Sequence, residues 1–149
     1  MTNHLIAVNK KAEHDYKILE TFEAGIVLTG QEVKSIKGGH INLVGSYIIL
    51  KNHEAWLIGA HVPPYKMAGP LPGYEPTRNR KLLLKKKELN TLAGKIKQKG
   101  LTLVPLKVYT KRGKIKLEFG LACGKKKYEK KEIIKKREIE KRIREAMKL

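Results

Sequence analysis

The most regular pattern in the chain is the segment KIKLEFGL at 114–121, which has an apolar residue at every second position. A strand with one face on a core and the other in water shows this period of two. The preceding segment, 101–110, is also rich in β-forming residues, so the two together predict a hairpin. This hairpin places Lys107, Lys114 and Lys116 on its outer face, which is therefore predicted to be basic.

Two earlier segments also predict strands. The run YKILETFEAGIVL at 16–28 is rich in β-formers, and Gly25 within it indicates a bulge or bend. The segment SYIILKNHEAWLIGAHV at 46–62 predicts a hairpin that turns at 51–54. The next stretch, 63–78, holds five of the six prolines and predicts a long exposed loop.

Two segments have apolar residues at the three- and four-residue spacing of a helix. Residues 30–39 carry apolar side chains three apart and end in two glycines, which is typical of a short helix with a glycine cap. The segment RKLLLKKKELNTLAGKIKQKG at 80–100 has Leu89, Leu92 and Ile96 at helical spacing and predicts the main helix.

Many short strands, a capping helix and glycine-marked bends predict a mainly β fold with some α structure. The best match is a small antiparallel β-barrel of the oligonucleotide-binding type with short helices. A sandwich of five or six strands is the alternative. The barrel is expected to span residues 1–123, followed by a basic tail at 124–149.

The tail predicts a helix without a core to pack on. Residues 132–149 contain neither glycine nor proline, and glutamates stand four positions before basic residues, a spacing that stabilises helices. The apolar stripe Ile139, Ile143 and Met147 is narrower than that of a packed helix. We therefore expect the tail to be largely disordered alone and helical when it docks on a negatively charged partner.

The net charge of the chain indicates which class of partner it binds. The chain has 33 Lys and Arg against 14 Asp and Glu, a net charge of +19. Such a surplus is commonly used to bind a polyanion, with an acidic membrane surface as the alternative. The sequence has no apolar run of about 18 residues and no signal-peptide pattern. With one cysteine no internal disulfide is possible, so a cytoplasmic protein is expected.

The sequence gives little support for a catalytic or metal-binding site. The five histidines have no metal-binding spacing, and the glycines around Cys123 lack the spacing of a phosphate-binding loop. Glu20 and Glu23 could be paired catalytic carboxylates, but a surface position and an ion pair are the simpler reading. Trp56 is expected in the core, and Cys123 is expected to be buried. We predict a binding protein without catalytic residues, metal or cofactor.

Six blocks of sequence, which cover nearly the whole chain in a fixed order, identify a family resemblance. They are NKKAEHDY at 9–16, ETFEAGIVLTGQEVKSIKGG at 20–39, SYI at 46–48, EPTRNRKLLL at 75–84, KGLTLVPLKVY at 99–109 and GKKKYEKKE at 124–132. Together they resemble the small protein B family, the bacterial SsrA-binding proteins that are the tmRNA partners in trans-translation.

The resemblance implies a non-enzymatic adaptor. Its barrel would hold the tRNA-like domain of tmRNA near the elbow and replace the missing anticodon arm. Its tail would become helical in the empty mRNA channel of a stalled 70S ribosome, at the decoding centre formed by 16S rRNA. Alanyl-tmRNA would then enter with elongation factor Tu and GTP, and the stalled peptide would be tagged for proteolysis.

The resemblance also implies site residues. The tmRNA-binding positions are Asn9, Lys10, Lys11, His14, Tyr16, Glu23, Lys34, Lys37, Leu83 and Lys116. Glu23 would orient basic or amide neighbours at the RNA face, because a carboxylate does not itself attract phosphate. Leu83 is equally well explained by core packing that supports the surface.

In the tail, the resemblance assigns ribosome contacts to GKKKYEKK. Gly124 would be a hinge, Lys125 and Lys126 would contact ribosomal RNA, and Tyr128 would stack on a base, an arrangement that an aromatic among lysines favours independently. Lys130 and Lys131 complete this set. Family members usually have Asp-Lys-Arg after the ring residue, whereas this chain has Glu129-Lys130-Lys131, and lysine lacks the bidentate fork of arginine.

Two other functions remain open at this stage. A general ribosomal protein or RNA chaperone would bind any structured RNA with similar affinity. A small RNA-processing enzyme would depend on Glu20, Glu23 or a histidine.

Overall fold

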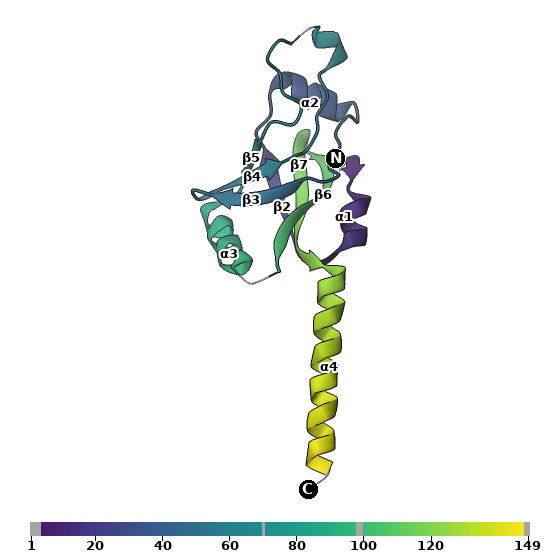
Figure 1. The fold of residues 1–149 in the computed structure, drawn as a ribbon. Coiled ribbons are helices and arrows are strands. Elements are labelled where there is room, and N and C mark those ends of the chain that lie inside the picture. The colour runs from purple at the N-terminus through teal and green to yellow at the C-terminus, as the bar shows by residue number, and fades with distance from the viewer. Residues whose placement is uncertain (1–3, 70, 98–99, 148–149) are drawn as a thin grey trace.

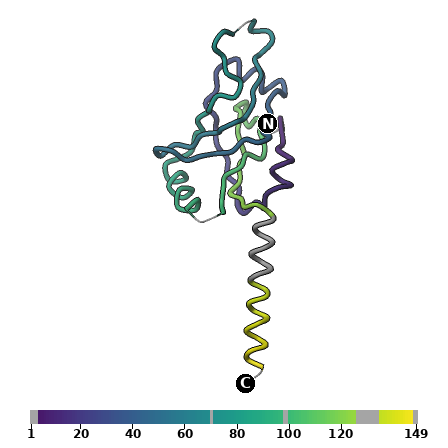
Figure 2. The backbone as a smooth tube through the Cα atoms, viewed as in Figure 1, coloured from purple at the N-terminus to yellow at the C-terminus, as the bar shows by residue number. Residues whose placement is uncertain are grey.

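The computed structural model describes residues 4–69, 71–97 and 100–147, with the side chains of this range apart from those of 126–134. Strands and short helices form one body, from which a long C-terminal helix extends (Figures 1 and 2). None of the helices within the described ranges is long and apolar enough to cross a membrane.

The body is a closed antiparallel sheet. Its strands are β1 (His4–Val8), β2 (Tyr16–Ile26), β3 (Tyr47–Lys51), β4 (Glu54–Ile58), β5 (Arg80–Leu83), β6 (Thr102–Lys111) and β7 (Lys114–Gly124). The order of the described strands is β1-β6-β3-β4-β5-β2-β7, and β6 also pairs with β7. This last pairing closes the sheet into a barrel, with β1 outside the ring. The mainly β class with short helices is thus confirmed, and a two-sheet sandwich is excluded.

Local irregularities bend the strands enough to close the ring. The register of β2 against β7 shifts between Ile18 and Glu20. Of the two alternatives predicted for Gly25, a bulge or a bend, the bulge is not found there, since the register shift lies at Ile18 and Glu20. Gly25 pairs with Leu83 of β5 and also with Lys116 of β7, so it marks the point where β2 passes from one neighbour to the other.

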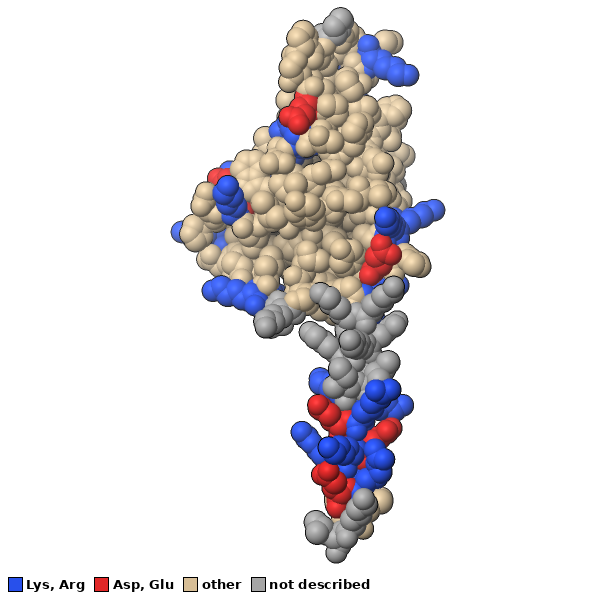
Figure 3. Space-filling model, viewed as in Figure 1, with Lys and Arg blue, Asp and Glu red and all other residues tan. Residues whose placement is uncertain are grey.

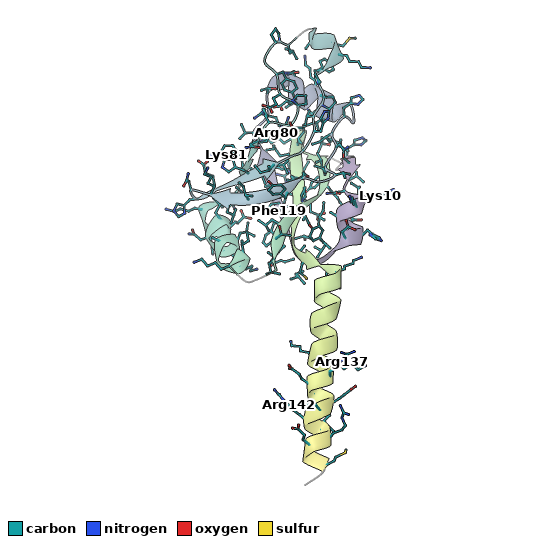
Figure 4. The ribbon with its side chains drawn as sticks, viewed as in Figure 1. Lys10, Arg80, Lys81, Phe119, Arg137 and Arg142 are labelled. Atoms are coloured by element: carbon teal, nitrogen blue, oxygen red, sulfur yellow. The ribbon has the colours of Figure 1, made fainter. Side chains whose placement is uncertain are left out.

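The barrel interior is filled by the alternating residues that the sequence pattern indicated. Ile115, Leu117, Phe119 and Leu121 are all buried. Phe119, near the centre of the barrel in Figure 4, stacks on Phe22 with 5.5 Å between ring centroids. The hairpin of β6 and β7 is therefore confirmed as a central part of the core.

Gly120 is a tight point on the opposite face of β7, in a second cluster of buried side chains that includes Val104, Leu106 and Ala122 and is separate from the main core. A Cβ atom added there would lie 2.9 Å from Cγ2 of Ile18 and 3.2 Å from Cδ1 of Leu106. We expect Gly120→Ala to lower the free energy of unfolding by about 1–3 kcal/mol, because the neighbours must shift to admit the methyl group. Urea denaturation measures the change.

The matched control is Gly94→Ala, in the interior of a helix with no atom within 4 Å of the added methyl. This change should raise the free energy of unfolding by about 0.5–1 kcal/mol, because alanine favours helix more than glycine does. Equal stability of the two variants would contradict the packing described for Gly120.

The shorter helices lie around the barrel, and the long one extends from it (Figure 1). They are α1 (Lys10–Asp15), α2 (Gly30–Lys37), the 3-10 turn η1 (Lys66–Ala68), α3 (Lys86–Ile96) and α4 (Lys125–Met147). The short helix at 30–39 is confirmed. The single helix predicted for 80–100 is corrected, because its first four residues form β5 and, among the described residues of this range, the helix covers 86–96. The sequence patterns predicted neither β1 nor α1.

The hairpin of β3 and β4 turns at Asn52 and His53, which both have a positive φ, as the two-residue turns of twisted hairpins require. The hairpin predicted for this segment is thus confirmed.

The prediction that Trp56 lies in the core is wrong. Its neighbours Ala55 and Leu57 are buried, and Trp56, pointing to the opposite side, is half-buried on the outer face of the barrel.

A buried ion network ties the proline-rich loop to the barrel. The carboxylate of Glu32 on α2 accepts hydrogen bonds from Nε of Arg80 at 2.8 Å and from Nε of Arg78 at 3.1 Å. Tyr74 also donates to Glu32, at 3.3 Å. Glu32 further accepts from the backbone N–H of Thr29, which completes the N-terminal cap of α2. Both Glu32 and Arg80 are fully buried.

Candidate nucleic-acid interface

The first group of predicted RNA-binding residues lies on or next to α1. The side chain of Asn9 is buried: it accepts a hydrogen bond from the backbone N–H of Ala12 and donates to the carbonyls of Leu43 and Pro105. Asn9 therefore begins the helix and attaches it to the barrel, as an N-cap residue does. With its side-chain groups engaged in this way, Asn9 positions its neighbours and does not face solvent.

The neighbours of Asn9 do face solvent. Lys10, Lys11 and His14 are exposed, and Tyr16 is half-buried at the start of β2. Nδ1 of His14 lies 3.0 Å from Oδ1 of Asp15, and this hydrogen bond lowers the pKa of the Asp15 carboxyl.

A cavity of about 360 Å³ lies beside this helix. Its lining includes Lys11, Tyr16, Tyr47 and Thr102, so it has aromatic, cationic and hydroxyl groups. A cavity of this composition beside α1 offers both stacking surface and hydrogen-bonding groups to a nucleotide.

The second group lies where β2, β5 and β7 meet on the outside of the barrel. A Cβ added at Gly25 would lie 3.4 Å from Cδ1 of Leu83 and 3.8 Å from Nζ of Lys116. Leu83 is exposed and not part of the core. Glu23 is the next outward-facing residue along β2, so the structure brings Glu23, Leu83 and Lys116 to one surface.

Two residues that the sequence reasoning did not assign complete this surface. The hydroxyl of Tyr109 donates to Oε2 of Glu23, and Nζ of Lys111 lies 3.4 Å from Oε1. The hydrogen bond from Tyr109 is the main cause of a lowered pKa for Glu23, and Lys111 adds to it. Burial and the same hydrogen bond raise the pKa of Tyr109. Glu23 is thus a carboxylate that holds a phenol and an ammonium group in place.

Glu20 and Glu23, which were considered as paired carboxylates, are engaged by different partners. Glu20 forms an ion pair with Lys95 of α3, whereas Glu23 is held by Tyr109 and Lys111. Nζ of Lys95 also lies 5.7 Å from the ring centroid of Phe22, which stands between the two glutamates in sequence. Among the residues described, no group of His, Cys, Asp and Glu side chains could hold a metal ion. Cys123 is buried, as predicted.

The third group lies on α2, at the end of the barrel opposite α4 (Figure 1). Lys34 and Lys37 are exposed on this helix, and Nζ of Lys34 lies 5.8 Å from the ring centroid of Tyr65. The predicted RNA-binding residues are therefore spread over α1, over the outer surface of β2, β5 and β7, and over α2.

The predicted ribosome-contacting residues lie at the start of α4. Gly124 is the last residue of β7 and pairs with Tyr16, and the helix begins at Lys125 without a loop. No atom lies within 4 Å of a Cβ built on Gly124, and its φ is not positive, so a hinge role stays a prediction. The side chains of Lys126, Tyr128, Lys130 and Lys131 lie outside those described.

The rest of α4 is solvent-exposed on all sides. Every described side chain from Lys135 to Met147 is exposed, including Ile139 and Ile143 of the narrow apolar stripe. Lys and Arg cover most of the face of this part of the helix that Figure 3 shows, with a few Glu among them, and Arg137 and Arg142 extend from different sides (Figure 4). The helical conformation is the one predicted for the docked tail, and the expected disorder of the free tail stays a prediction.

The residues predicted to bind RNA thus lie on three parts of the barrel, and α4 is a basic helix whose described side chains from Lys135 to Met147 are exposed. Known proteins resemble the chain in sequence and in structure. The family model for SmpB protein matches residues 6–149. The chain belongs to the SmpB family. An SsrA-binding protein from Sulfurihydrogenibium sp. is 55% identical over 153 residues, and the alignment covers 100% of both chains. The SsrA-binding protein of Shouchella clausii is 54% identical, with 96% of this chain and 94% of the relative covered.

A solved structure agrees with this membership of the SmpB family. It is described as "tmRNA-SmpB: a journey to the center of the bacterial ribosome", and it is 49% identical in sequence with a TM-score of 0.67. The match covers 80% of this chain and 83% of that chain.

Proposed function

We propose that the protein is a non-enzymatic, tmRNA-binding adaptor that delivers alanyl-tmRNA to stalled ribosomes for trans-translation and peptide tagging. The observation that carries the proposal is a closed barrel followed by a basic helix whose described side chains from Lys135 to Met147 are all exposed and have no core to pack on. Relatives about half identical in sequence are named SsrA-binding proteins, and a similar structure is named for tmRNA-SmpB and the ribosome.

The barrel holds the tRNA-like domain of tmRNA in this proposal. Lys10, Lys11, His14 and Tyr16 contact RNA from α1, and Asn9 keeps that helix in place. A second contact comes from the surface of Glu23, Leu83 and Lys116, where Glu23 orients Tyr109 and Lys111. Lys34 and Lys37 reach backbone phosphates from α2.

The helix α4 occupies the empty mRNA channel. It has 23 residues, which gives a length of about 35 Å and a diameter of about 10–12 Å with side chains. Lys125, Lys126, Lys130 and Lys131 contact 16S rRNA near the decoding centre, Tyr128 stacks on a base there, and Gly124 is the hinge. Elongation factor Tu with GTP acts indirectly, through alanyl-tmRNA.

A competition gel shift tests the proposal. The labelled tRNA-like domain is bound to the protein at physiological salt, and an excess of ordinary tRNA is added. We expect the tRNA-like domain to stay bound, because the barrel recognises its shape in addition to its phosphates. Affinity that comes only from counterion release is available from any RNA of similar charge.

The net charge of +19 supports one other function, that of a general ribosomal protein or RNA chaperone. The same experiment separates the two functions. Displacement in proportion to the concentration of tRNA would contradict the adaptor proposal and support the general RNA binder.

A further inference from the structure

The outer face of β3, β4, β5 and the end of β2 carries a row of apolar side chains. Tyr47 pairs with Ile58, and Ile49 pairs with Trp56 across the first two strands. Directly opposite residues of an antiparallel pair point to the same side of a sheet, so all four lie on the outer face. We call this surface the Trp56 face; it consists of Tyr47, Ile49, Trp56, Ile58, Lys81, Leu83 and Val27.

The row continues onto the next strands. Trp56 pairs with Lys81 of β5, and the backbone N–H of Val27 donates to the carbonyl of Lys81 at 2.9 Å. Leu83 is two residues beyond Lys81 and therefore on the same side of the strand. The Trp56 face is thus continuous across four segments that are distant in sequence.

The Trp56 face is unusually apolar for its exposure. Tyr47, Ile49, Val27 and Leu83 are 46%, 37%, 44% and 55% exposed. Figure 3 shows few charged side chains over β3 and β4, although the chain as a whole is strongly basic. An exposed apolar patch of several large side chains marks an interaction site more often than an accident of the surface.

The surrounding charges favour RNA as the occupant. Lys51 ends β3, Lys81 lies within the face, and Lys116 lies at its border beside Leu83. Glu54, the one acidic side chain in β3, β4 and β5, is engaged by Nζ of Lys81 at 3.2 Å. Rings interleaved with lysines bind unpaired bases by stacking and phosphates by charge. A second copy of the chain, with its own +19, would be repelled.

The position of the face supports the same occupant. Tyr47 lies at one end of it and also lines the cavity beside α1, together with Lys11 and Tyr16. Leu83 lies at the other end, on the surface with Glu23 and Lys116. The Trp56 face therefore joins the two barrel surfaces to which the proposed function assigns the tRNA-like domain.

We propose that the Trp56 face is a stacking surface for unpaired bases of the bound RNA, with Trp56 and Tyr47 as the aromatic contacts and Lys81 as a phosphate contact. The inference rests on the proposed function, because it assigns additional contacts to the same RNA. It adds base stacking on the outer face of β3, β4 and β5 to the contacts made by α1 and by the surface around Glu23.

The chain provides its own probe, because Trp56 is its single tryptophan. The full-length protein is titrated with the tRNA-like domain of tmRNA while tryptophan emission and a gel shift are recorded on the same samples. We expect Trp56 emission to be quenched in step with the formation of the shifted complex. A fully paired, blunt-ended RNA duplex of similar charge is the control, because its bases are paired along its whole length and it should shift without quenching.

Two variants test the energetic contribution of Trp56 by gel shift. Trp56→Leu keeps apolar packing but removes the ring, and should weaken binding about 5- to 100-fold. Trp56→Phe keeps a ring and should retain most of the affinity. Met67→Ala, at an exposed side chain in η1 away from the face, is the matched control and should bind like the unmodified protein.

The possible outcomes separate the inference from the proposed function. A shifted complex with unchanged Trp56 emission, or full affinity of Trp56→Leu, would overturn the stacking role and leave the adaptor function standing. Failure of the tRNA-like domain to bind at all would overturn both. The emission of the unmodified protein decides the matter even where Trp56→Leu does not fold.

Discussion

Truncation after Gly124 is expected to abolish peptide tagging on stalled ribosomes while leaving the affinity for the tRNA-like domain nearly intact. β7 ends at Gly124, so the cut leaves every strand of the barrel whole. The described side chains from Lys135 to Met147 are exposed, so their removal takes nothing from the core. The measurements are a gel shift with the tRNA-like domain and a tagging assay in a reconstituted translation system.

The truncation also removes a net charge of +7 out of +19. The contribution of this charge to RNA affinity depends strongly on salt, so the gel shift is best done at physiological salt, where nonspecific attraction is weak. The control variant keeps the tail composition of 125–147 but shuffles its order. If truncation lowered tmRNA affinity as much as it lowered tagging, the proposed division between barrel and tail would be wrong.

The second large effect is expected at Arg80. Arg80→Met removes the guanidinium from the fully buried carboxylate of Glu32 and also from the carbonyls of Ala60 and Pro76, to which it donates at 3.0 and 2.9 Å. The buried carboxylate keeps Arg78 as a charged partner but loses its fully buried one, and two carbonyls lose their donors. The free energy of unfolding should therefore fall by about 3 kcal/mol. Urea denaturation near neutral pH measures this loss.

Lys81→Met is the matched control on the neighbouring residue. Lys81 pairs with Glu54, and both side chains are about 40% exposed, so this pair contributes at most about 1 kcal/mol. The two changes alter net charge equally and lie on the same strand. A similar loss of stability in both variants would contradict the importance assigned to the buried pair.

The same network predicts how stability depends on pH. Burial opposes the ionisation of Glu32, but hydrogen bonds from Arg78, from the N–H of Thr29 and from Arg80 outweigh it and lower the pKa from 4.5 to about 2. Because the folded-state pKa is lowered, this stabilisation is present in full above about pH 4.5 and is lost as the pH falls towards 2. In Arg80→Met this part of the acid-induced loss should be smaller.

The sequence predicted the elements whose pattern is local. The period of two in 114–121 was enough to place β7, because one face of that strand meets the core along its length. The helical spacing of Leu89, Leu92 and Ile96 likewise identified α3. The predicted start of this helix was too early, because residues 80–83 form a strand. Arg80 and Leu82 point inward and Lys81 and Leu83 outward, but the consecutive leucines hide this period of two in the sequence.

What the sequence could not supply are contacts between distant segments. Glu32 and Arg80 are 48 positions apart, and a buried arginine is rare enough that composition would place it on the surface. Tyr109 and Glu23 are 86 positions apart, so the partner of that carboxylate was not visible. Trp56 was expected in the core because it stands between the apolar residues Ala55 and Leu57. Successive residues of a strand point to opposite faces, however, so these two neighbours are buried and Trp56 points outward.

Because no loop separates β7 from α4, a rotation of the barrel is transmitted directly to the helix. As long as the proposed hinge at Gly124 does not bend, α4 continues from a strand that is hydrogen-bonded to β2 and β6, and its direction follows the orientation of the barrel. Over a length of about 35 Å, a turn of the barrel by about 10° moves the far end of the helix by about 6 Å. A small change in how the barrel is held thus becomes a displacement larger than one helical turn at the tip.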